Sequence, residues 1–138
     1  MADVGKALNP RQVEAQEMGG SMQGIGNALH EEMLFDETGT LRNASLDEYH
    51  VPAIADMPRQ FLSNIVENED GPGPYGAKGV GEGALAGVAA AIATALADAG
   101  VTIDELPATP ERIWRALHDN RGAGESYDSA DEGEQRWG

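Results

Sequence analysis

The residues best suited to chemistry lie in a glycine-rich stretch, residues 71–83, that carries Lys78 and Glu82. Five glycines fall between Gly71 and Gly81, together with two prolines. This composition excludes regular structure and lets a ligand approach the backbone closely. A carboxylate placed in such a loop can act as a general base. It can equally do no more than interact with the start of the helix that follows.

Phosphate binding by this stretch is not indicated. The sequence GAKGVGEG fits neither the GxxxxGK[ST] pattern nor GxGxxG after a strand. The negative charge of Glu82 would also repel a phosphate at a helix N-terminus.

An alanine-rich helix is predicted directly after the loop. No residue from Ala84 to Ala97 is charged, and leucine, valine and isoleucine recur at helical spacing. We therefore predict a helix that is buried nearly all round, with Glu82 sheltered at its N-terminus and Gly100 just beyond its end. The apolar run is too short for a membrane span, which needs about 18 residues.

A second helix is predicted after Pro10, which suits a first helical position. Its apolar face is predicted to comprise Val13, Met18, Met22, Ile25, Leu29 and Met33. Another side gathers Gln16, Gly19, Gly20, Gln23 and Gly26. Each glycine costs about 1 kcal/mol in an exposed helix interior, so something must offset the four at positions 19, 20, 24 and 26. Tight packing and close approach of a ligand both remain open.

The remaining segments are predicted mainly from turn and cap residues. Residues 36–39 form a turn before a strand at 40–43, the prolines at 52 and 58 exclude helix from residues 46–58, and residues 59–69 contain a strand. The last helix starts with Thr109 as N-cap and Pro110 at its first position. Residues 119–138, with six acidic and two basic side chains, are predicted to be a tail that is disordered or docked on a partner through Trp137.

Composition excludes several functional classes. The 138 residues carry a formal net charge of −15, which argues against nucleic acid and anionic membranes as partners. The absence of cysteine excludes disulfides and iron–sulfur ligands, and the three histidines lack the spacing of a zinc site. No metal ligand is predicted in this chain. The N-terminus lacks the apolar core of a secretion signal, so we expect a cytoplasmic protein.

Three motifs in order resemble the C-terminal part of the molybdenum-binding large subunit of the xanthine dehydrogenase and aldehyde oxidase family. They are MGGSMQGIGNALHEE, GAKGVGE followed by the alanine-rich helix, and ELPATPERIWRAL. The resemblance extends from Asp3 to Leu117. It implies an α+β fold in which residues 1–118 form the C-terminal portion of a molybdopterin-binding domain that a partner chain completes.

The resemblance also implies roles for individual residues. Glu82 falls on the glutamate that serves as the base beside the molybdenum. Gln23 falls on a glutamine that lies against the pterin, within a segment that includes Gly20 and Gly24. The backbone along the molybdenum side of the site would be that of Ala77, Lys78, Gly79, Val80 and Gly81. Lys78 is expected to position this loop rather than to react.

The implied protein is a small subunit of a multi-subunit molybdenum hydroxylase. It would share a molybdopterin-type cofactor with a larger molybdenum-binding subunit and hydroxylate an electron-poor carbon of an N-heterocycle or aldehyde, with oxygen from water. Electrons would pass to 2Fe-2S clusters and FAD in partner subunits.

The substrate class stays open, because Gly83 and Ala84 follow Glu82 where many members have two prolines, a form more like the carbon monoxide dehydrogenase branch. Met1 falls inside what would be the family's final domain, so we expect a separately encoded piece. A non-catalytic assembly subunit and a piece cut from a longer enzyme are the alternatives.

Overall fold

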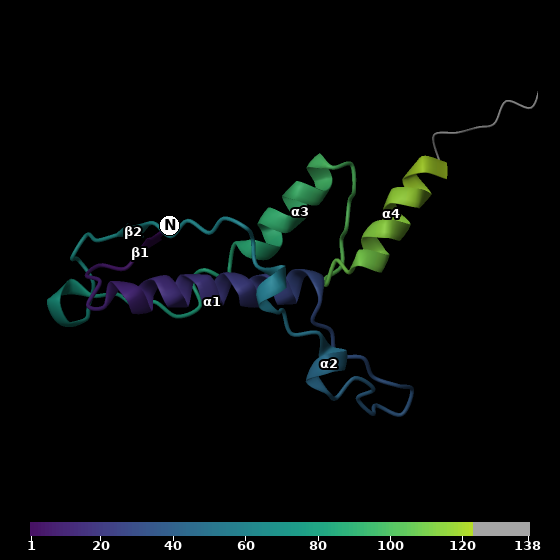
Figure 1. The fold of residues 1–138 in the computed structure, drawn as a ribbon, viewed down its shortest axis with the longest axis horizontal. Coiled ribbons are helices and arrows are strands. Elements are labelled where there is room, and N and C mark those ends of the chain that lie inside the picture. Colours follow the sequence, from purple (N-terminus) through teal and green to yellow (C-terminus); the bar gives the residue numbers. More distant parts are fainter. Residues whose placement is uncertain (123–138) are drawn as a thin grey trace, which may run out of the picture.

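The computed structural model describes residues 1–122, which are arranged around one long helix, α1 (Figure 1). The elements in chain order are β1 (Ala2–Asp3), α1 (Pro10–Leu29), α2 (Leu46–Tyr49), β2 (Ile65–Val66), α3 (Val88–Asp98) and α4 (Pro110–Gly122), with short 3-10 helices at Ile54–Asp56 and Pro74–Gly76. This part of the chain is mostly helical with one small parallel sheet. The predicted mixture of helix and strand is therefore confirmed, with much less strand than expected.

Helix α1 starts and ends where its local chemistry dictates. The Asn9 side chain accepts a hydrogen bond from Gln12 N at 3.3 Å, and Pro10 occupies the first turn, as predicted. At the other end, His30 N donates to Gly26 O at 2.9 Å. The helix holds 20 residues, about 30 Å of rigid scaffold on which the other elements are placed.

The sheet consists of β1 and β2, which run parallel and pair Ala2 with Ile65 and Asp3 with Val66. The strand predicted within residues 59–69 is thus limited to two residues. Regular pairing stops at Asp3 and Val66: beyond them the two segments are joined by Val4 N to Val66 O at 2.9 Å and by Glu69 N to Gly5 O at 3.1 Å, and Gly5 adopts φ +64°.

The segment between α1 and β2 is more helical than predicted. The exclusion of helix from residues 46–58 was wrong, because Ser45 caps α2 through a bond from Glu48 N at 3.3 Å and the helix ends at His50, before Pro52. The turn at 36–39 is confirmed, since Asp36 accepts from Thr38 N and Thr40 N at 2.9 Å. The strand predicted at 40–43 is only a single bridge, Phe35 to Leu41.

Helix α3 differs from its prediction at the start and in its burial. It begins at Val88 rather than Ala84, because residues 82–87 form successive tight turns in which Leu85 N bonds Glu82 O at 3.1 Å and Val88 N bonds Leu85 O at 3.1 Å. Gly83 and Gly87 disfavour helix there. The prediction of nearly complete burial was wrong: α3 has no buried residue, since only α1 packs closely against it.

The end of α3 matches its prediction. Gly100 has φ +82°, and its N–H bonds Ala97 O at 3.0 Å, while Val101 N bonds Leu96 O at 2.8 Å. These two bonds form a Schellman motif, which satisfies carbonyl groups that the helix leaves open. Val101 is buried as a result of this turn.

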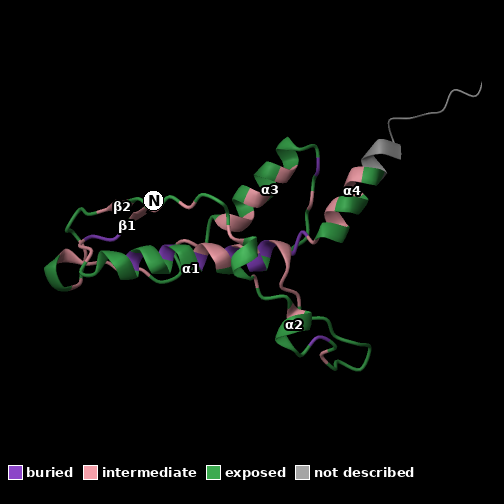
Figure 2. Cartoon of the chain, viewed as in Figure 1, coloured by how far each residue is buried: buried purple, intermediate pink, exposed green. Residues whose placement is uncertain are grey.

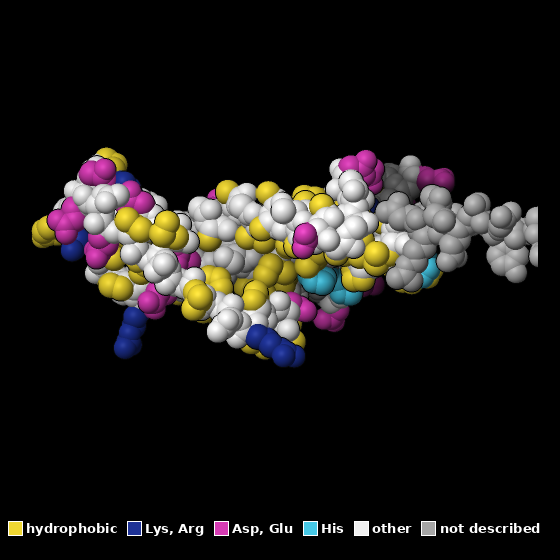
Figure 3. Space-filling view, turned by 90° about the horizontal axis from the view of Figure 1, so that it is seen from above, with side chains coloured by type: hydrophobic (Ala, Val, Ile, Leu, Met, Phe, Trp, Pro, Cys, Tyr) yellow, Lys and Arg dark blue, Asp and Glu magenta, His cyan; other side chains and the backbone are white. Residues whose placement is uncertain are grey.

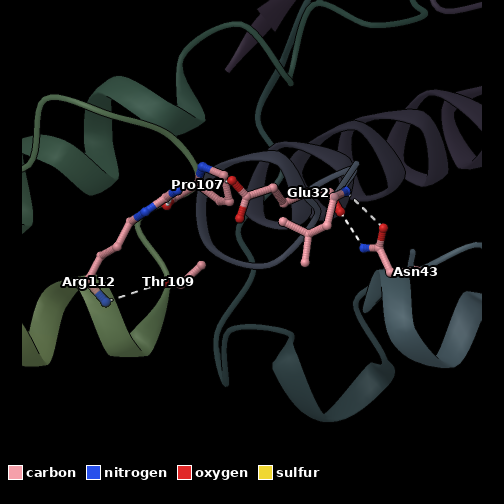
Figure 4. Close-up of polar contacts among 6 residues, drawn as sticks. Glu32, Asn43, Pro107, Thr109 and Arg112 are labelled. Atoms are coloured by element: carbon pink, nitrogen blue, oxygen red, sulfur yellow. Dashed lines mark hydrogen bonds and ion pairs between the residues drawn. The ribbon is translucent and has the colours of Figure 1, made fainter. Parts of the chain in front are cut away.

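Helix α4 starts at the predicted cap and is joined to the end of α1 by polar contacts (Figure 4). Arg112 N donates to Thr109 Oγ1 at 3.3 Å, and its guanidinium bonds Pro107 O at 2.6 Å and Glu32 Oε1 at 3.0 Å. The buried amide of Asn43 donates to Glu32 O at 2.6 Å. Glu32 therefore connects three segments that are distant in sequence.

Helix α4 continues to Gly122, past the predicted boundary at residue 118. The remainder of the predicted tail, including Trp137, lies outside the described residues. The division into a domain at 1–118 and a tail at 119–138 stays a prediction.

The core of residues 1–122 is small, and Figure 2 shows buried positions on α1 and in separate segments away from it, including the connection between α3 and α4. Its buried apolar residues are Val4, Val13, Ala28, Val101 and Ala108. Large apolar side chains are exposed elsewhere, including Ile54, Leu62 and Tyr75 at 84% each. Figure 3 shows hydrophobic side chains spread along one face of the molecule. This surface is unusual for a self-contained domain, which hides most of its large apolar groups in one core.

Candidate functional site

The glycine-rich loop between β2 and α3 is fastened to β1 by Lys78. Lys78 N donates to Val4 O at 2.9 Å, and Lys78 Nζ lies 2.6 Å from Asp3 Oδ2 and 2.7 Å from Asp70 Oδ1. Asp3 is itself held, because Gly5 N donates to its Oδ1 at 3.0 Å and Asn68 Nδ2 to its Oδ2 at 2.9 Å. Lys78 therefore fixes the loop four residues before Glu82.

These contacts favour the charged forms of both groups. The hydrogen bond from Lys78, followed by those from Gly5 and Asn68, lowers the pKa of Asp3 from 3.8 to about 2. The hydrogen bonds to Asp3 and Asp70 raise the pKa of Lys78 above its usual 10.5. The geometry thus gives Lys78 the positioning role expected from the sequence, while its contact with a cofactor stays a prediction.

The first glycines of the loop are required by the packing of this chain. A Cβ on Gly71 would lie 2.3 Å from Ala77 O, and one on Gly76 would lie 2.1 Å from Glu69 O. Gly5, outside the loop, packs against it in the same way, because a Cβ there would lie 2.0 Å from Gly76 O. The later glycines are different: a Cβ on Gly79, Gly81 or Gly83 would meet no atom within 4 Å beyond those of the two adjoining residues. Packing within residues 1–122 therefore gives no reason for glycine at 79, 81 and 83.

The backbone of this later part of the loop is also free to bind. Within residues 1–122, none of the six consecutive N–H groups from Gly79 to Ala84 donates a hydrogen bond to the protein. Side chains normally limit access to such a run of backbone N–H groups. Here three of the six residues are glycine, so access is open. A row of free donors on an open backbone is suited to a ligand that carries hydrogen-bond acceptors.

Glu82 lies in the middle of this row, and its position differs from the prediction. Its side chain is exposed, and it lies in the turns before α3 rather than at the N-terminus of that helix. Among residues 1–122 its carboxylate makes no hydrogen bond or ion pair. Within residues 1–122 the predicted shelter is absent, because α3 starts later, at Val88.

The three α1 residues predicted to contact a pterin, Gly20, Gln23 and Gly24, differ in their surroundings. Gly20 and Gly24 face α3 and the turns before it: a Cβ on Gly24 would lie 2.6 Å from Val88 Cβ, and one on Gly20 would lie 3.2 Å from Ala84 Cβ. Tight packing therefore explains these two glycines within this chain. Gln23 is exposed. The predicted contacts of all three with a pterin stay predictions.

A cavity of about 250 Å³ brings the loop to the start of α1. Its lining includes Gln12, Val13 and Gln16 from α1, and Ala77, Lys78 and Val80 from the loop. The predicted loop residues and the glutamine-bearing side of α1 are thus brought together, although through Gln12 and Gln16 rather than Gln23.

Sequence reasoning missed Glu17, the most buried carboxylate among the described residues at 6% exposed. The Ser63 hydroxyl donates a hydrogen bond to its Oε2. The apolar face predicted for α1 passed over position 17. Residues 13, 17, 20, 24 and 28 share one helical face and are all buried, and this spacing could have identified Glu17.

Residues 1–122 contain neither a cluster of metal-ligating side chains nor a membrane-spanning helix. No group of three or more His, Cys, Asp or Glu side chains there is placed to hold a metal ion. No helix in that range is both long and apolar enough to cross a membrane.

Comparison with known sequences gives consistent matches. Residues 1–58 match the family described as the molybdopterin cofactor-binding domain. The chain is 43% identical over 118 residues to the putative xanthine dehydrogenase molybdenum-binding subunit of Escherichia coli (strain K12), which covers 84% of this chain. It is 39% identical over 117 residues to the gamma subunit of the 6-hydroxypseudooxynicotine dehydrogenase complex of Paenarthrobacter nicotinovorans, which covers 81% of this chain.

A solved structure matches the fold as well. Quinoline 2-oxidoreductase from Pseudomonas putida 86 superposes with a TM-score of 0.72 at 37% identity over 85% of this chain. In each comparison the chain spans only a small part of the other protein: 16% of the Escherichia coli subunit, 14% of the gamma subunit and 15% of the quinoline enzyme.

Proposed function

The chain is homologous to a segment of the molybdenum-binding large subunits of the xanthine dehydrogenase and aldehyde oxidoreductase family, and from this premise we propose a shared active site. In this proposal the chain is part of a molybdenum hydroxylase, in which it supplies the catalytic base Glu82 and one wall of the molybdopterin pocket. A larger molybdenum-binding polypeptide supplies the rest. Electrons leave through 2Fe-2S clusters and FAD carried by partner subunits.

The observation that carries the proposal is the free backbone from Gly79 to Ala84. Its six N–H groups lack acceptors among the described residues, and its three glycines leave open space that a Cβ would fill. Exposed donors can bind water, but a loop that serves no ligand has no need of glycine at three positions where side chains would fit. The glycines at 5 and 71 show the contrast, because there packing alone requires them.

These residues fit an organic cofactor that carries hydrogen-bond acceptors. The backbone of Gly79, Val80 and Gly81 would hold one edge of it, and Gln23 would offer an amide with both donors and acceptors to a pterin. When bound, the molybdenum cofactor supplies the redox chemistry that removes two electrons from the substrate. The residues of this chain bind and orient it and move the proton.

Glu82 is the group proposed to take that proton. Its carboxylate is exposed, unpaired among residues 1–122 and set between free N–H groups, so nothing in this range competes for it. The clamp from Lys78 to Asp3 and Asp70 limits its movement from four residues away. A partner polypeptide that covers the loop would exclude water and so strengthen the base.

The substrate is proposed to be a small molecule with an electron-poor carbon, either an N-heterocycle or an aldehyde. The similarity to quinoline 2-oxidoreductase favours a heterocycle. Turnover of the assembled enzyme on quinoline and on benzaldehyde would separate the two classes.

The test of the base is Glu82→Gln in the assembled enzyme. A positioned general base typically contributes 10²- to 10⁴-fold, so we expect turnover to fall by about that factor. Molybdenum and pterin contents should stay at the wild-type level, because the amide keeps the size of the side chain and the backbone that holds the cofactor is unchanged.

The matched control is Glu14→Gln, which removes the same charge from an exposed position on α1. It should leave turnover unchanged. If Glu82→Gln retains full turnover with molybdenum bound, Glu82 is not the base, and the chain is better described as a non-catalytic assembly subunit.

A further inference from the structure

The buried side of α1 contains one charged residue, Glu17. Residues 13, 17, 20, 24 and 28 form this side, and the other four are valine, glycine or alanine. Glu17 is only 6% exposed. Burying a carboxylate is costly unless hydrogen bonds offset the loss of water, so its partners reveal what it does.

One carboxylate oxygen has a protein partner. The Ser63 hydroxyl donates to Glu17 Oε2, which ties the middle of α1 to the segment that leads into β2. Oε1 has no protein partner among residues 1–122, yet none of the buried side-chain polar atoms described is without a partner. Oε1 is therefore not sealed from solvent, and it is available as an acceptor.

The space that adjoins Glu17 lies under the loop that carries Glu82. A cavity of about 140 Å³ is lined by Glu17, by β1 with the adjoining Val4, and by the loop residues Gly79, Val80, Gly81, Gly83 and Ala84. A second, of about 220 Å³, is lined by Glu17, Ser21, Phe61, Leu62, Gly83 and Ala84. Glu17 is common to both, and so are Gly83 and Ala84, two of the six residues whose N–H groups have no acceptor among the described residues.

We propose that Glu17 is a positioning residue for the loop segment Gly79–Ala84, acting through water held in these cavities on the backbone N–H groups of Gly83 and Ala84, which line both of them. The N–H groups of Gly79, Val80 and Gly81 stay available to the cofactor. A bound water needs only about 10–15 Å³ and two or more polar partners, and both conditions are met beside a carboxylate and a row of free donors. Hydrogen bonds to a charged acceptor are stronger than neutral ones. From its place on α1, Glu17 thus steadies the loop segment that carries Glu82.

This inference rests on the proposed function for its catalytic meaning, but its test does not. The measurement is hydrogen exchange of the Gly79–Ala84 amides in the assembled enzyme, with kcat and molybdenum content recorded on the same samples. In Glu17→Ala the amides of Gly83 and Ala84 should exchange about tenfold faster, because the carboxylate that holds their bridging water in place is lost. The amides of α4 should keep their rates, and kcat should fall at unchanged molybdenum content.

Glu17→Gln keeps an acceptor without the charge, so exchange should rise less and kcat should recover in part. Glu14→Ala, an exposed neighbour on α1, should change neither. Should Glu17→Ala fail to assemble, Ser63→Ala releases the same carboxylate and is expected to speed the same amides.

Unchanged exchange at Gly79–Ala84 in both Glu17→Ala and Ser63→Ala would overturn the inference. Faster exchange throughout the chain would overturn it too, because it indicates global destabilisation. Faster local exchange together with a fully active Glu82→Gln variant would leave Glu17 as a loop-positioning residue and reject the proposed base instead.

Discussion

The loop before Glu82 is held by the ion pairs of Lys78 with Asp3 and Asp70. Lys78 contacts both carboxylates at 2.6 Å and 2.7 Å, and Asp3 also accepts from Gly5 N and Asn68. All three ionised groups are partly solvated, so each pair by itself is worth little. Their effect comes from joining β1, the acidic segment before the loop and the loop itself at one point.

The clamp gives the chain a defined pH dependence. The pKa of Asp3 is lowered from 3.8 to about 2, so its contribution to stability is present above pH 3.8 and is lost as pH falls toward 2. The wild type should therefore be more stable than Asp3→Asn from pH 4 to 7. This advantage should disappear as pH falls to 2. Urea unfolding at stepped pH, followed by circular dichroism, measures both curves.

The stability that Lys78 contributes to this ion-pair clamp depends on pH only in the alkaline range. Its pKa is raised, so its contribution is complete below pH 10.5 and is lost only above that value.

Asp36→Asn is a control for the Asp3 variant, because the pKa of Asp36 is also lowered, chiefly by Thr38, but its turn is remote from the loop in sequence. A stability advantage over Asp3→Asn that persists unchanged at pH 2 would contradict the clamp.

At the scale of single residues, the sequence indicated which residues matter better than it indicated what surrounds them. Glu82 and Lys78 were identified from the loop motif, and Lys78 does fasten the loop. The shelter predicted for Glu82 is missing, because it depended on where α3 begins. Glu17 was not found, since its role depends on Ser63, which is distant in sequence and approaches only in the folded chain.

At the scale of elements, the contact between α1 and α3 determines where the loop lies relative to the long helix. Gly24 is the closest point of approach, because a Cβ there would lie 2.6 Å from Val88 Cβ. Gly20 approaches Ala84, in the turns before α3, in the same way. Two glycines at adjacent turns of α1 therefore make room for the start of α3 and keep the loop beside α1.

Gly24→Ala should destabilise the assembled protein. The added methyl gains about 1 kcal/mol in helix propensity, but overpacking against Val88 costs about 1–3 kcal/mol, so we expect a net loss near 1 kcal/mol. Gly19→Ala is the matched control, because a Cβ there meets no atom of another residue within 4 Å and only the propensity gain remains. Thermal unfolding compares the two variants. Greater stability in both would show that Gly24 is not required by packing.

The helix caps could be predicted from the sequence. Strand length and helix burial could not, because they depend on tertiary contacts. Asn9 with Pro10, Thr109 with Pro110, and Gly100 all mark helix ends as local chemistry dictates. The strand within residues 59–69 was overestimated because its length depends on pairing with β1, which ends at Asp3. The burial of α3 was overestimated because alanine-rich sequence indicates a helix that can be buried, without indicating what covers it.

At the scale of the whole molecule, residues 1–122 bury too little apolar surface to stand alone. The buried apolar core comprises five residues, none larger than valine, whereas Ile54, Leu62 and Tyr75 are each 84% exposed. The chain spans 12% to 16% of the relatives that it matches. If the proposed larger polypeptide completes the domain, the apolar side chains that lie open here are where it should pack.

This leads to a prediction for the chain purified alone. It should bind a hydrophobic dye strongly and unfold in a broad transition, because little of its apolar surface is buried cooperatively. Adding a polypeptide that spans the remaining part of the large subunit should abolish dye binding and raise Tm with partner concentration. A partner at 100 times its Kd stabilises the folded state by about 2.7 kcal/mol. A sharp transition without dye binding in the chain alone would instead show that residues 1–122 form a self-sufficient domain, and that the exposed side chains need no partner.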